Sequence, residues 1–279
     1  MHSRIILGSV MPASLDQIVA ATRVRVAESR RSADLRDLER RAQNHHPRGL
    51  RRALQAASEN GVAIVAELKK ASPSRGLIRP DFDAESLATE LERGGATALS
   101  VLTDEEFFQG SLENLHRASS GTNLPCLRKD FIVDEFQVLE ARANSADAIL
   151  LIVAALSQAG LTALADSARD LGLDVLCEVH DEDQLHRALD AGCDVIGVNN
   201  RDLRTFQVDL ATAVRLADLI PKYALRVAES GIHSGADIAR LRATGYQAFL
   251  IGESLMKAAS PGQALRALLA EASLPVSIP

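Results

Sequence analysis

Short apolar segments recur along this chain at intervals of roughly 25 residues, and amphipathic helical patterns separate them. The segments are rich in Val, Ile, Leu and Ala without strict alternation, which is typical of parallel strands covered on both faces. The predicted strands are Ala63–Glu67, Ala98–Leu102, Pro125–Lys129, Ala148–Val153, Val175–Val179, Val195–Asn199, Leu225–Glu229 and Ala248–Gly252. The helices predicted after them are Ala84–Arg93, Leu112–Ala118, Asp134–Ala143, Gln158–Leu171, Asp181–Ala191, Leu210–Leu219, Gly235–Thr244 and Gly262–Ala270.

Eight strand–helix units in a chain of 279 residues favour a (β/α)8 TIM barrel, with a doubly wound open sheet as the alternative. We expect the barrel to occupy residues 61–279 and a helical extension, residues 1–60, to pack on it. Within the extension, Ser14 and Gln17 have the spacing of a capping box, and a second helix is predicted at Leu50–Ser58. The extension either covers one barrel end or contributes to a ligand site.

Charge and hydropathy exclude several classes of protein. The formal net charge of -6 argues against a nucleic-acid partner. The arginines between Arg23 and Arg52 alternate with acidic residues, which predicts a solvated helix face. The longest apolar run, Ala148–Leu156, is too short to span a bilayer, and the N-terminus has no apolar core of a signal peptide. We therefore expect a soluble, cytoplasmic protein with no membrane partner.

The cysteines and histidines show no metal-site pattern. Cys126, Cys177 and Cys193 lack CxxC spacing and are expected to be reduced, mostly buried thiols. His45 and His46 precede a proline and are interpreted as part of a loop. We expect no metal.

Charged residues gather where the predicted strands end, and the active site of a barrel of this type lies at the carboxyl ends of its strands. The polar residues at these ends are Glu67, Lys69, Lys129, Glu178, Asn199, Arg201, Glu229 and Ser230. Because side chains alternate along a strand, Glu67 and Lys69 share one face with Val65, taken here as the barrel interior. Arg128 and Cys177 are then predicted to point outward at the helices.

Three carboxylates and two ammonium groups converging on one barrel mouth predict a catalytic site. Buried charges are costly unless paired, and enclosed sets of them commonly have shifted pKa values. A lysine in such a set can act as a general acid. The alternative is a set of strand-end salt bridges in a packed barrel.

Two small-residue loops predict a phosphate site. Ser230-Gly231 follows the seventh strand and Gly252-Glu253-Ser254 follows the eighth, the two loops that commonly bind phosphate in such barrels. Glycine lets the backbone approach an anion closely, although ordinary turns also contain glycine. The loop from Ser72 to Gly76 is expected to close over the ligand, with Arg75 either in the site or solvated.

Several motifs together resemble the indole-3-glycerol phosphate synthase family. They are VAELKKASPSRG, SVLTDEEFFQGS, LRKDFIVDEFQV, ADAILLIVAAL, LCEVHDEDQL, IGVNNRDLRTF, VAESGIHS and FLIGESLM. They run in order over residues 62 to 270, so that every predicted strand contributes. The N-terminal part resembles the family chiefly in its helical pattern.

The resemblance implies conversion of 1-(2-carboxyphenylamino)-1-deoxyribulose 5-phosphate to indole-3-glycerol phosphate, carbon dioxide and water, without a metal or organic cofactor. By resemblance, Lys129 is the general acid, Glu178 is a second acid–base residue, and Lys69 pairs with the substrate carboxylate or assists proton transfer. Whether Lys69 or Glu178 serves the dehydration step stays open. The other matched positions are Glu67 as orienting residue, Asn199, Arg201, Glu229 and Ser230 at the substrate, Phe108 and Phe131 at the anthranilate ring, and Ser72, Gly231, Gly252, Glu253 and Ser254 at the phosphate end.

Two other functions fit the residues less well. An isomerase of the same pathway would use Asp and Cys, or two Asp, at its strand ends, unlike the Lys and Glu set of this chain. A non-catalytic barrel that binds sugar phosphates would tolerate loss of Lys129 or Glu178, and both are present. We expect a phosphorylated small molecule as substrate and a monomer or weak oligomer.

Overall fold

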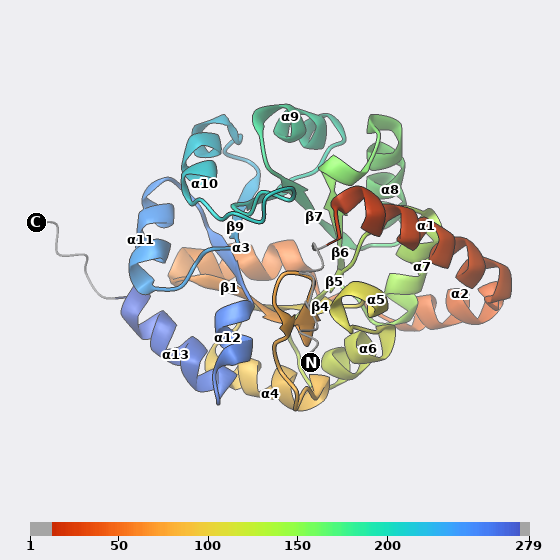
Figure 1. Cartoon of the computed structure of the whole chain (residues 1–279), viewed down its shortest axis with the longest axis horizontal. Helices are drawn as coiled ribbons and strands as arrows, with labels where there is room; N and C mark the ends of the chain where they lie inside the picture. The colour runs from red at the N-terminus through yellow and green to blue at the C-terminus, as the bar shows by residue number, and fades with distance from the viewer. Residues whose placement is uncertain (1–12, 274–279) are drawn as a thin grey trace, which may run out of the picture.

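A closed barrel of parallel strands forms the centre of the molecule (Figure 1). The computed structural model describes residues 13–273. In it the strands follow the closed order β1-β10-β9-β8-β7-β6-β5-β4, which confirms the TIM barrel and excludes an open sheet. The barrel strands are β1 (Ala63–Leu68), β4 (Ala98–Leu102), β5 (Cys126–Lys129), β6 (Ala148–Ile152), β7 (Asp174–Val179), β8 (Val195–Asn199), β9 (Leu225–Glu229) and β10 (Ala248–Ile251).

The helices that surround the barrel agree closely with the sequence pattern. They are α4 (Ala84–Gly94), α6 (Leu112–Ser120), α7 (Glu135–Ala143), α8 (Gln158–Asp170), α9 (Glu182–Asp190), α10 (Ala211–Leu216) with a 3-10 turn at Ala217–Leu219, α11 (Gly235–Ala243) and α13 (Pro261–Ala272). Most of them begin after a Ser or Asp side chain that accepts a hydrogen bond from a first-turn backbone N–H, as Asp83 does before α4. Such caps fix where each helix leaves its loop.

Four short elements at the strand ends were not predicted. They are the hairpin β2 (Ala71–Ser72) and β3 (Gly76–Leu77), the helix α5 (Glu105–Phe108), the 3-10 turn Val153–Ala155 and the helix α12 (Glu253–Lys257). Elements of two to five residues are too short to show a hydrophobic period. They matter because they carry side chains at the carboxyl end of the barrel.

Strand alternation divides the core into two layers. Val65, Leu127 and Leu176 belong to a cluster inside the barrel. Cys177 belongs to the larger cluster between strands and helices, and Arg128 points outward to the carboxylates of Asp130 and Glu140. The predicted inward and outward faces are therefore confirmed. All three cysteines are buried and free.

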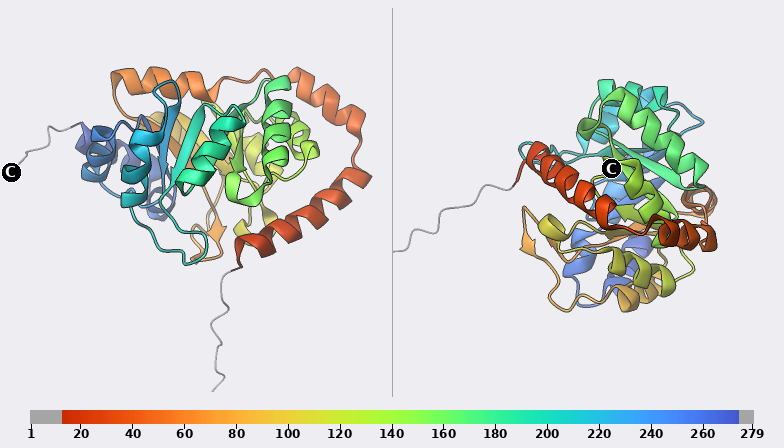
Figure 2. Two further views of the ribbon diagram at one scale, coloured as in Figure 1. Left: turned by 90° about the horizontal axis from the view of Figure 1, so that it is seen from above. Right: turned by 90° about the vertical axis from the view of Figure 1, so that its right-hand side faces the viewer.

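The N-terminal extension wraps the barrel from one end to the other (Figure 2). It consists of α1 (Leu15–Ser32), with the predicted capping box, α2 (Leu35–Asn44), which packs on α7, and α3 (Leu50–Asn60). Fully buried Leu50 and Leu54 of α3 join the interior cluster with Ala63 and Ala98, which begin their strands. The helix α3 thus closes the amino end of the barrel. Residues 1–12 and 274–279 lie outside the described residues, and the division of the chain at residue 60 stays a prediction.

The arginine-rich extension is only partly a solvated surface. Arg23 is exposed, as predicted. The prediction is wrong for Arg48, whose backbone N–H and guanidinium donate to fully buried Asp147 at 2.6–2.9 Å. His45 lies in the predicted loop and brings its Nε2 to 3.2 Å from the same carboxylate. The linker between α2 and α3 is therefore pinned to the start of β6. A buried carboxylate requires such partners, which periodicity cannot reveal.

Candidate active site

All the predicted site residues line one pocket of about 370 Å³ at the carboxyl end of the barrel. The pocket wall contains Glu67, Lys69, Ser72, Phe108, Lys129, Phe131, Glu178, Asn199, Arg201, Glu229, Ser230, Gly231, Gly252, Glu253 and Ser254. This volume falls in the range of sites for small molecules, about 300–1,000 Å³. The structure therefore brings together side chains from every part of the barrel sequence.

Lys129 lies at the centre of the charged cluster. Its Nζ donates to Glu229 Oε2 at 3.2 Å and lies 3.7 Å from both Glu67 Oε2 and Glu178 Oε2. These three acids lie at the ends of strands β1, β7 and β9, so the lysine reaches across the barrel to strands on both sides. Its side chain is 14% exposed, which leaves a small opening toward the pocket.

The cluster fixes the protonation state of its lysine. Burial by itself would lower the pKa of Lys129, but the negative charges of Glu229, Glu67 and Glu178 outweigh burial and raise that pKa above its ordinary value. Lys129 is therefore an ammonium group at neutral pH. That is the state required of a proton donor.

The carboxylates are not equivalent. Burial, opposed by Lys129 and assisted by the charge of Glu178, raises the pKa of Glu229 to about 7. Burial also acts on Glu67, but Lys69 and Lys129 overcome it and lower the pKa of that carboxyl. The cluster thus contains one acid that titrates near neutrality and one that stays ionised, a separation typical of acid–base sites.

Glu67 links the two lysines. Lys69 Nζ donates to Glu67 Oε1 at 2.5 Å, while Glu67 Oε2 faces Lys129. Lys69 comes directly after the last residue of β1, Leu68. By strand alternation its side chain lies on the interior face with Glu67, and it lines the pocket. Glu67 therefore bridges two cations, Lys69 two residues later in the chain and Lys129 on β5.

Glu229 reaches its position because β8 has no side chain at Gly197. Gly197 pairs with Glu178 on one side and with Val227 on the other. A Cβ at Gly197 would lie 2.2 Å from Glu229 Oε1, closer than atoms can approach. That oxygen is buried and has no hydrogen-bond partner among the described residues. The sequence contains this glycine within a strand, a recognised signal of close approach, but the signal was missed.

An aromatic wall forms the side of the pocket near α5. The rings of Phe108 and Phe131 are tilted by 40° with centroids 6.2 Å apart, a geometry that aromatic pairs favour. Phe108 ends α5, and Phe131 follows the end of β5 by two residues. Leu15 and Ile18 of α1 line the same pocket. The extension therefore reaches the site, which the sequence had left open.

The loops after β9 and β10 form the opposite side. Ser230 and Gly231 both have positive φ angles, 65° and 78°, and a Cβ at Gly231 would meet Val208 at 2.4 Å. A Cβ at Gly252 would meet Glu67 Oε1 at 2.6 Å. The structure shows that Gly252 leaves room for Glu67, and its predicted role beside an anion stays a prediction. Both glycines are required by close packing.

Glu253 forms ion pairs with several basic side chains at this side of the pocket. Arg75 Nε lies 3.1 Å from Glu253 Oε1, and Arg201 lies 3.9 Å from Glu253 Oε2. Burial opposes ionisation, but Lys257 and Arg75 lower the pKa of Glu253. The ion pair with Arg75 ties the β2–β3 hairpin to α12, and Ser72 and Arg75 line the pocket, while closure of this loop over a ligand stays a prediction. Arg75 is in the site, although 55% of its side chain is exposed.

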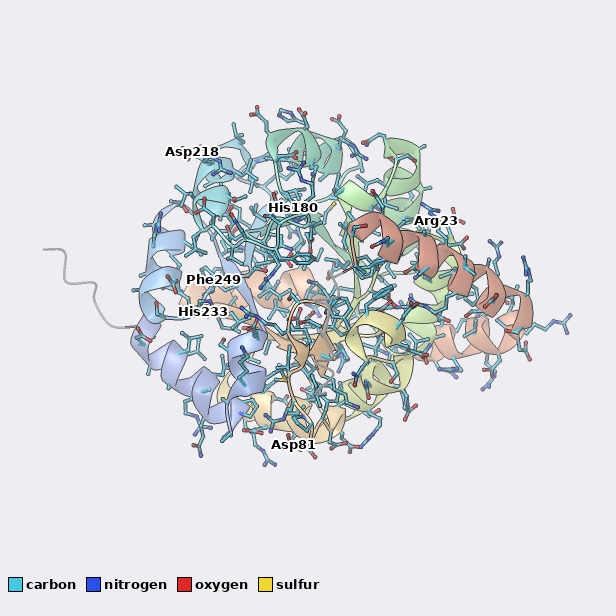
Figure 3. The ribbon with its side chains drawn as sticks, viewed as in Figure 1. Arg23, Asp81, His180, Asp218, His233 and Phe249 are labelled. Carbon is cyan, nitrogen blue, oxygen red and sulfur yellow. The ribbon has the colours of Figure 1, made fainter. Side chains whose placement is uncertain are left out.

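Several pocket residues were not predicted. Besides Leu15 and Ile18, the wall includes Phe206 from the loop after β8 and His233 from the loop after β9. Figure 3 labels His233 together with His180, which follows β7 and brings its Nε2 to 3.5 Å from Glu178 Oε1. The aromatic residue in NRDLRTF was a usable signal for Phe206, because aromatic side chains commonly line ligand pockets.

Metal-binding and membrane-spanning features are both missing from the described part of the chain. Across residues 13–273, no group of three or more His, Cys, Asp and Glu side chains is arranged to hold a metal ion. In the same range, no helix is both long and apolar enough to cross a membrane.

Comparisons with known proteins agree with the geometry. The family model described as indole-3-glycerol phosphate synthase matches residues 15–268. The indole-3-glycerol phosphate synthase of Koribacter versatilis (strain Ellin345) is 59% identical over 259 residues, covering 93% of this chain and 100% of the relative.

Solved structures with similar barrels are more distant. KGPDC from Streptococcus mutans has a TM-score of 0.58 at 16% identity, over 75% of this chain and 96% of that chain. Thiamine phosphate pyrophosphorylase from Pyrococcus furiosus has a TM-score of 0.57 at 17% identity, over 76% of this chain and 98% of that chain. These likenesses concern the fold alone. The family match and the close relative, taken with the pocket, establish that the chain belongs to the indole-3-glycerol phosphate synthase family.

Proposed function

We propose that the chain acts as a carboxy-lyase that closes the pyrrole ring of indole-3-glycerol phosphate. Its substrate would be 1-(2-carboxyphenylamino)-1-deoxyribulose 5-phosphate, and its products indole-3-glycerol phosphate, carbon dioxide and water. The observation that carries the proposal is Lys129, half-buried and charged among three carboxylates at the mouth of a barrel of this family. Nothing in the site or in the comparisons favours an isomerase or a barrel without catalytic activity.

Lys129 acts as general acid in the condensation step. The ring carbon that bears the carboxylate attacks the ketone carbon, and Lys129 gives its proton to the ketone oxygen as the new carbon–carbon bond forms. The carboxylate then leaves as carbon dioxide and returns the bonding pair to the ring. Glu229 and Glu67 support this role, because their charges keep Lys129 protonated and hold its Nζ in place.

Dehydration completes the ring. The hydroxyl formed in the first step leaves as water once it is protonated, and the adjacent ring CH2 carbon then loses one proton, so that the new ring becomes aromatic and its nitrogen keeps its hydrogen. Glu178 and Lys69 are the candidates for the proton donor, both within the pocket wall. Glu178 Oε2 lies 3.7 Å from Lys129 Nζ, close enough for a proton to pass between the lysine and the carboxylate. Lys69 lies in the chain between β1, which ends at Leu68, and the β2–β3 hairpin, which begins at Ala71.

The two ends of the substrate fit the two sides of the pocket. The aromatic wall of Phe108 and Phe131 suits the anthranilate ring. The loops of Ser230-Gly231 and Gly252–Ser254, with Ser72 and Arg201 nearby, suit the phosphate. Asn199 Oδ1 accepts from the Arg201 backbone N–H at 3.0 Å, which holds this loop at the substrate. We further propose that residues 1–60 are an extension of the 61–279 barrel that completes the site.

A fluorescence assay tests the proposal directly. Purified protein supplied with the carboxyphenylamino substrate should form the fluorescent indole product, without an added metal or organic cofactor. Glu178→Gln and Lys69→Met should then be compared in single turnovers: the variant that accumulates a decarboxylated, still hydroxylated intermediate lacks the dehydration acid. Absence of indole product from the parent protein would refute the function.

A further inference from the structure

One arginine of the extension contacts both loops that carry the aromatic wall. Arg25 Nη2 lies 2.9 Å from Asp104 Oδ2 and 3.8 Å from Asp130 Oδ1. The side chains of Asp104 and Asp130 are 0% and 3% exposed. Arg25 lies on α1 with Thr22 and Val26, the buried side of that helix. It therefore enters the molecule through the same face that brings Leu15 and Ile18 to the pocket.

Each of the two carboxylates also holds one aromatic residue in place. Asp104 Oδ1 accepts from the backbone N–H of Phe107 at 2.7 Å and caps α5, which ends at Phe108. Asp130 Oδ1 accepts from the backbone N–H of Phe131 at 2.8 Å. Both anchors of the aromatic wall thus meet at a single guanidinium.

The two carboxylates differ in their other partners. Asp130 Oδ2 also accepts from Arg128 Nη2 at 3.0 Å and from Thr103 Oγ1 at 2.6 Å. For Asp104, Arg25 is the cationic partner that the structure records. Arg25 Nη1 is buried without a hydrogen-bond partner among the described residues, so the side chain gives up hydration to reach this place. A surface ion pair would not require that loss.

We infer that Arg25 is a positioning residue. It joins the extension to the loops of Phe108 and Phe131 and so holds these two rings where they contact the aromatic ring of the substrate. This inference rests on the proposed function. Arg25 has no ion pair or hydrogen bond with the Lys129 cluster among those recorded, so its effect should fall on substrate binding and little on the chemical step. Without Arg25, buried Asp104 lacks its cationic partner, and α5 and α1 should shift together.

The test uses Arg25→Met in the full chain, which keeps much of the aliphatic part of the side chain and removes the guanidinium group. Losing a charge-assisted hydrogen bond to a buried carboxylate should raise KM about tenfold, with kcat within about twofold of the parent. The matched control is Arg23→Met, two residues away on the same helix and exposed (Figure 3), which should leave both constants unchanged. Arg25→Lys should restore part of the affinity, because an ammonium can reach one carboxylate only.

A second variant checks the coupling between the partners. Asp104→Asn keeps an oxygen to cap α5 but removes the charge that faces Arg25. Asp104→Asn alone should raise KM as Arg25→Met does, and the double variant should be no worse than the weaker-binding single variant. Additive effects, or Arg25→Met behaving as Arg23→Met does, would overturn the inference. So would a fall in kcat with KM unchanged.

Hydrogen exchange separates this inference from the proposed function. The amides of Phe107 and Phe131 are bonded to the two carboxylates and should exchange faster in Arg25→Met than in Arg23→Met. An inactive parent protein would refute the synthase function, and equal exchange in the two variants would refute the positioning role. If Arg25→Met fails to fold, Arg25→Lys and Asp104→Asn decide the same question through KM.

Discussion

Replacing Lys129 with methionine is the most informative single change. Methionine keeps most of the volume of the side chain and removes the proton donor. General acid catalysis is worth about 10²–10⁴-fold, which corresponds to about 2.7–5.4 kcal/mol of transition-state stabilisation. We expect kcat of Lys129→Met to fall at least about 10²-fold, because the methionine side chain among Glu67, Glu178 and Glu229 has no proton to donate.

The same change should make folding stability more dependent on pH. Removing one partner from a buried ionic group costs about 3–5 kcal/mol when the remaining charge cannot be neutralised. Glu229 already has a pKa of about 7, raised by burial, and loss of Lys129 raises it further. A raised folded-state pKa gives stability that is present below the unfolded pKa and lost as pH rises through the folded one. Lys129→Met should therefore lose more stability than the parent between about pH 5.5 and about pH 8.

Two measurements and one control decide the matter. Turnover is followed by indole fluorescence, and the melting temperature is recorded at both pH values. Lys222→Met, an exposed lysine in the turn before β9, makes the same chemical change away from the pocket and should match the parent in both. Near-parent turnover in Lys129→Met, with unchanged circular dichroism, would show that another group is the acid.

Further changes probe the neighbours of Lys129. Glu178→Gln should lower kcat at least about 10²-fold with little change in KM, and an effect on KM alone would make Glu178 a binding residue. Gly252→Val should weaken the binding of substrate and of inorganic phosphate in calorimetry and also lower kcat, because its Cβ collides with Glu67; unchanged kcat would contradict that contact. For the parent, kcat/KM should fall as pH decreases through about 7, where Glu229 takes up a proton. Gly197→Ala displaces Glu229 and should move that limb of the profile; an unmoved limb assigns it to another group.

The sequence predicted the barrel and its interior face because both follow from local periodicity. A strand such as Val195–Asn199 agreed at both ends, and Ala63–Glu67 differed by one residue. Alternation alone put Lys129 inward and Arg128 outward, since neighbouring side chains on a strand point to opposite faces. The fifteen predicted site residues line one pocket for the same reason: parallel strands bring all their carboxyl ends to one edge.

What the sequence did not predict depends on contacts far apart in the chain. Arg25 meets Asp104 across 79 positions, and Arg48 meets Asp147 across 99. Both arginines lie in a stretch whose mixed charges are typical of a solvated helix, and no local period separates them from exposed Arg23. Which charged residues of an amphipathic helix enter a buried ionic contact depends on the surface that the helix covers, so the folded barrel was needed to identify them.

Register explains how three carboxylates can surround one lysine without clashing. Glu178 on β7 pairs with Gly197 on β8, and Asn199, two residues further along β8, pairs with Glu229 on β9. A side chain at Gly197 would collide with Glu229, and its absence leaves the space that Glu229 Oε1 occupies. Burial, assisted by the charges of Glu178 and Glu67, then raises the pKa of Glu229, while the charges of all three carboxylates keep Lys129 protonated. One glycine in the middle of a strand is thus required for both the geometry of the proton donor and its charge.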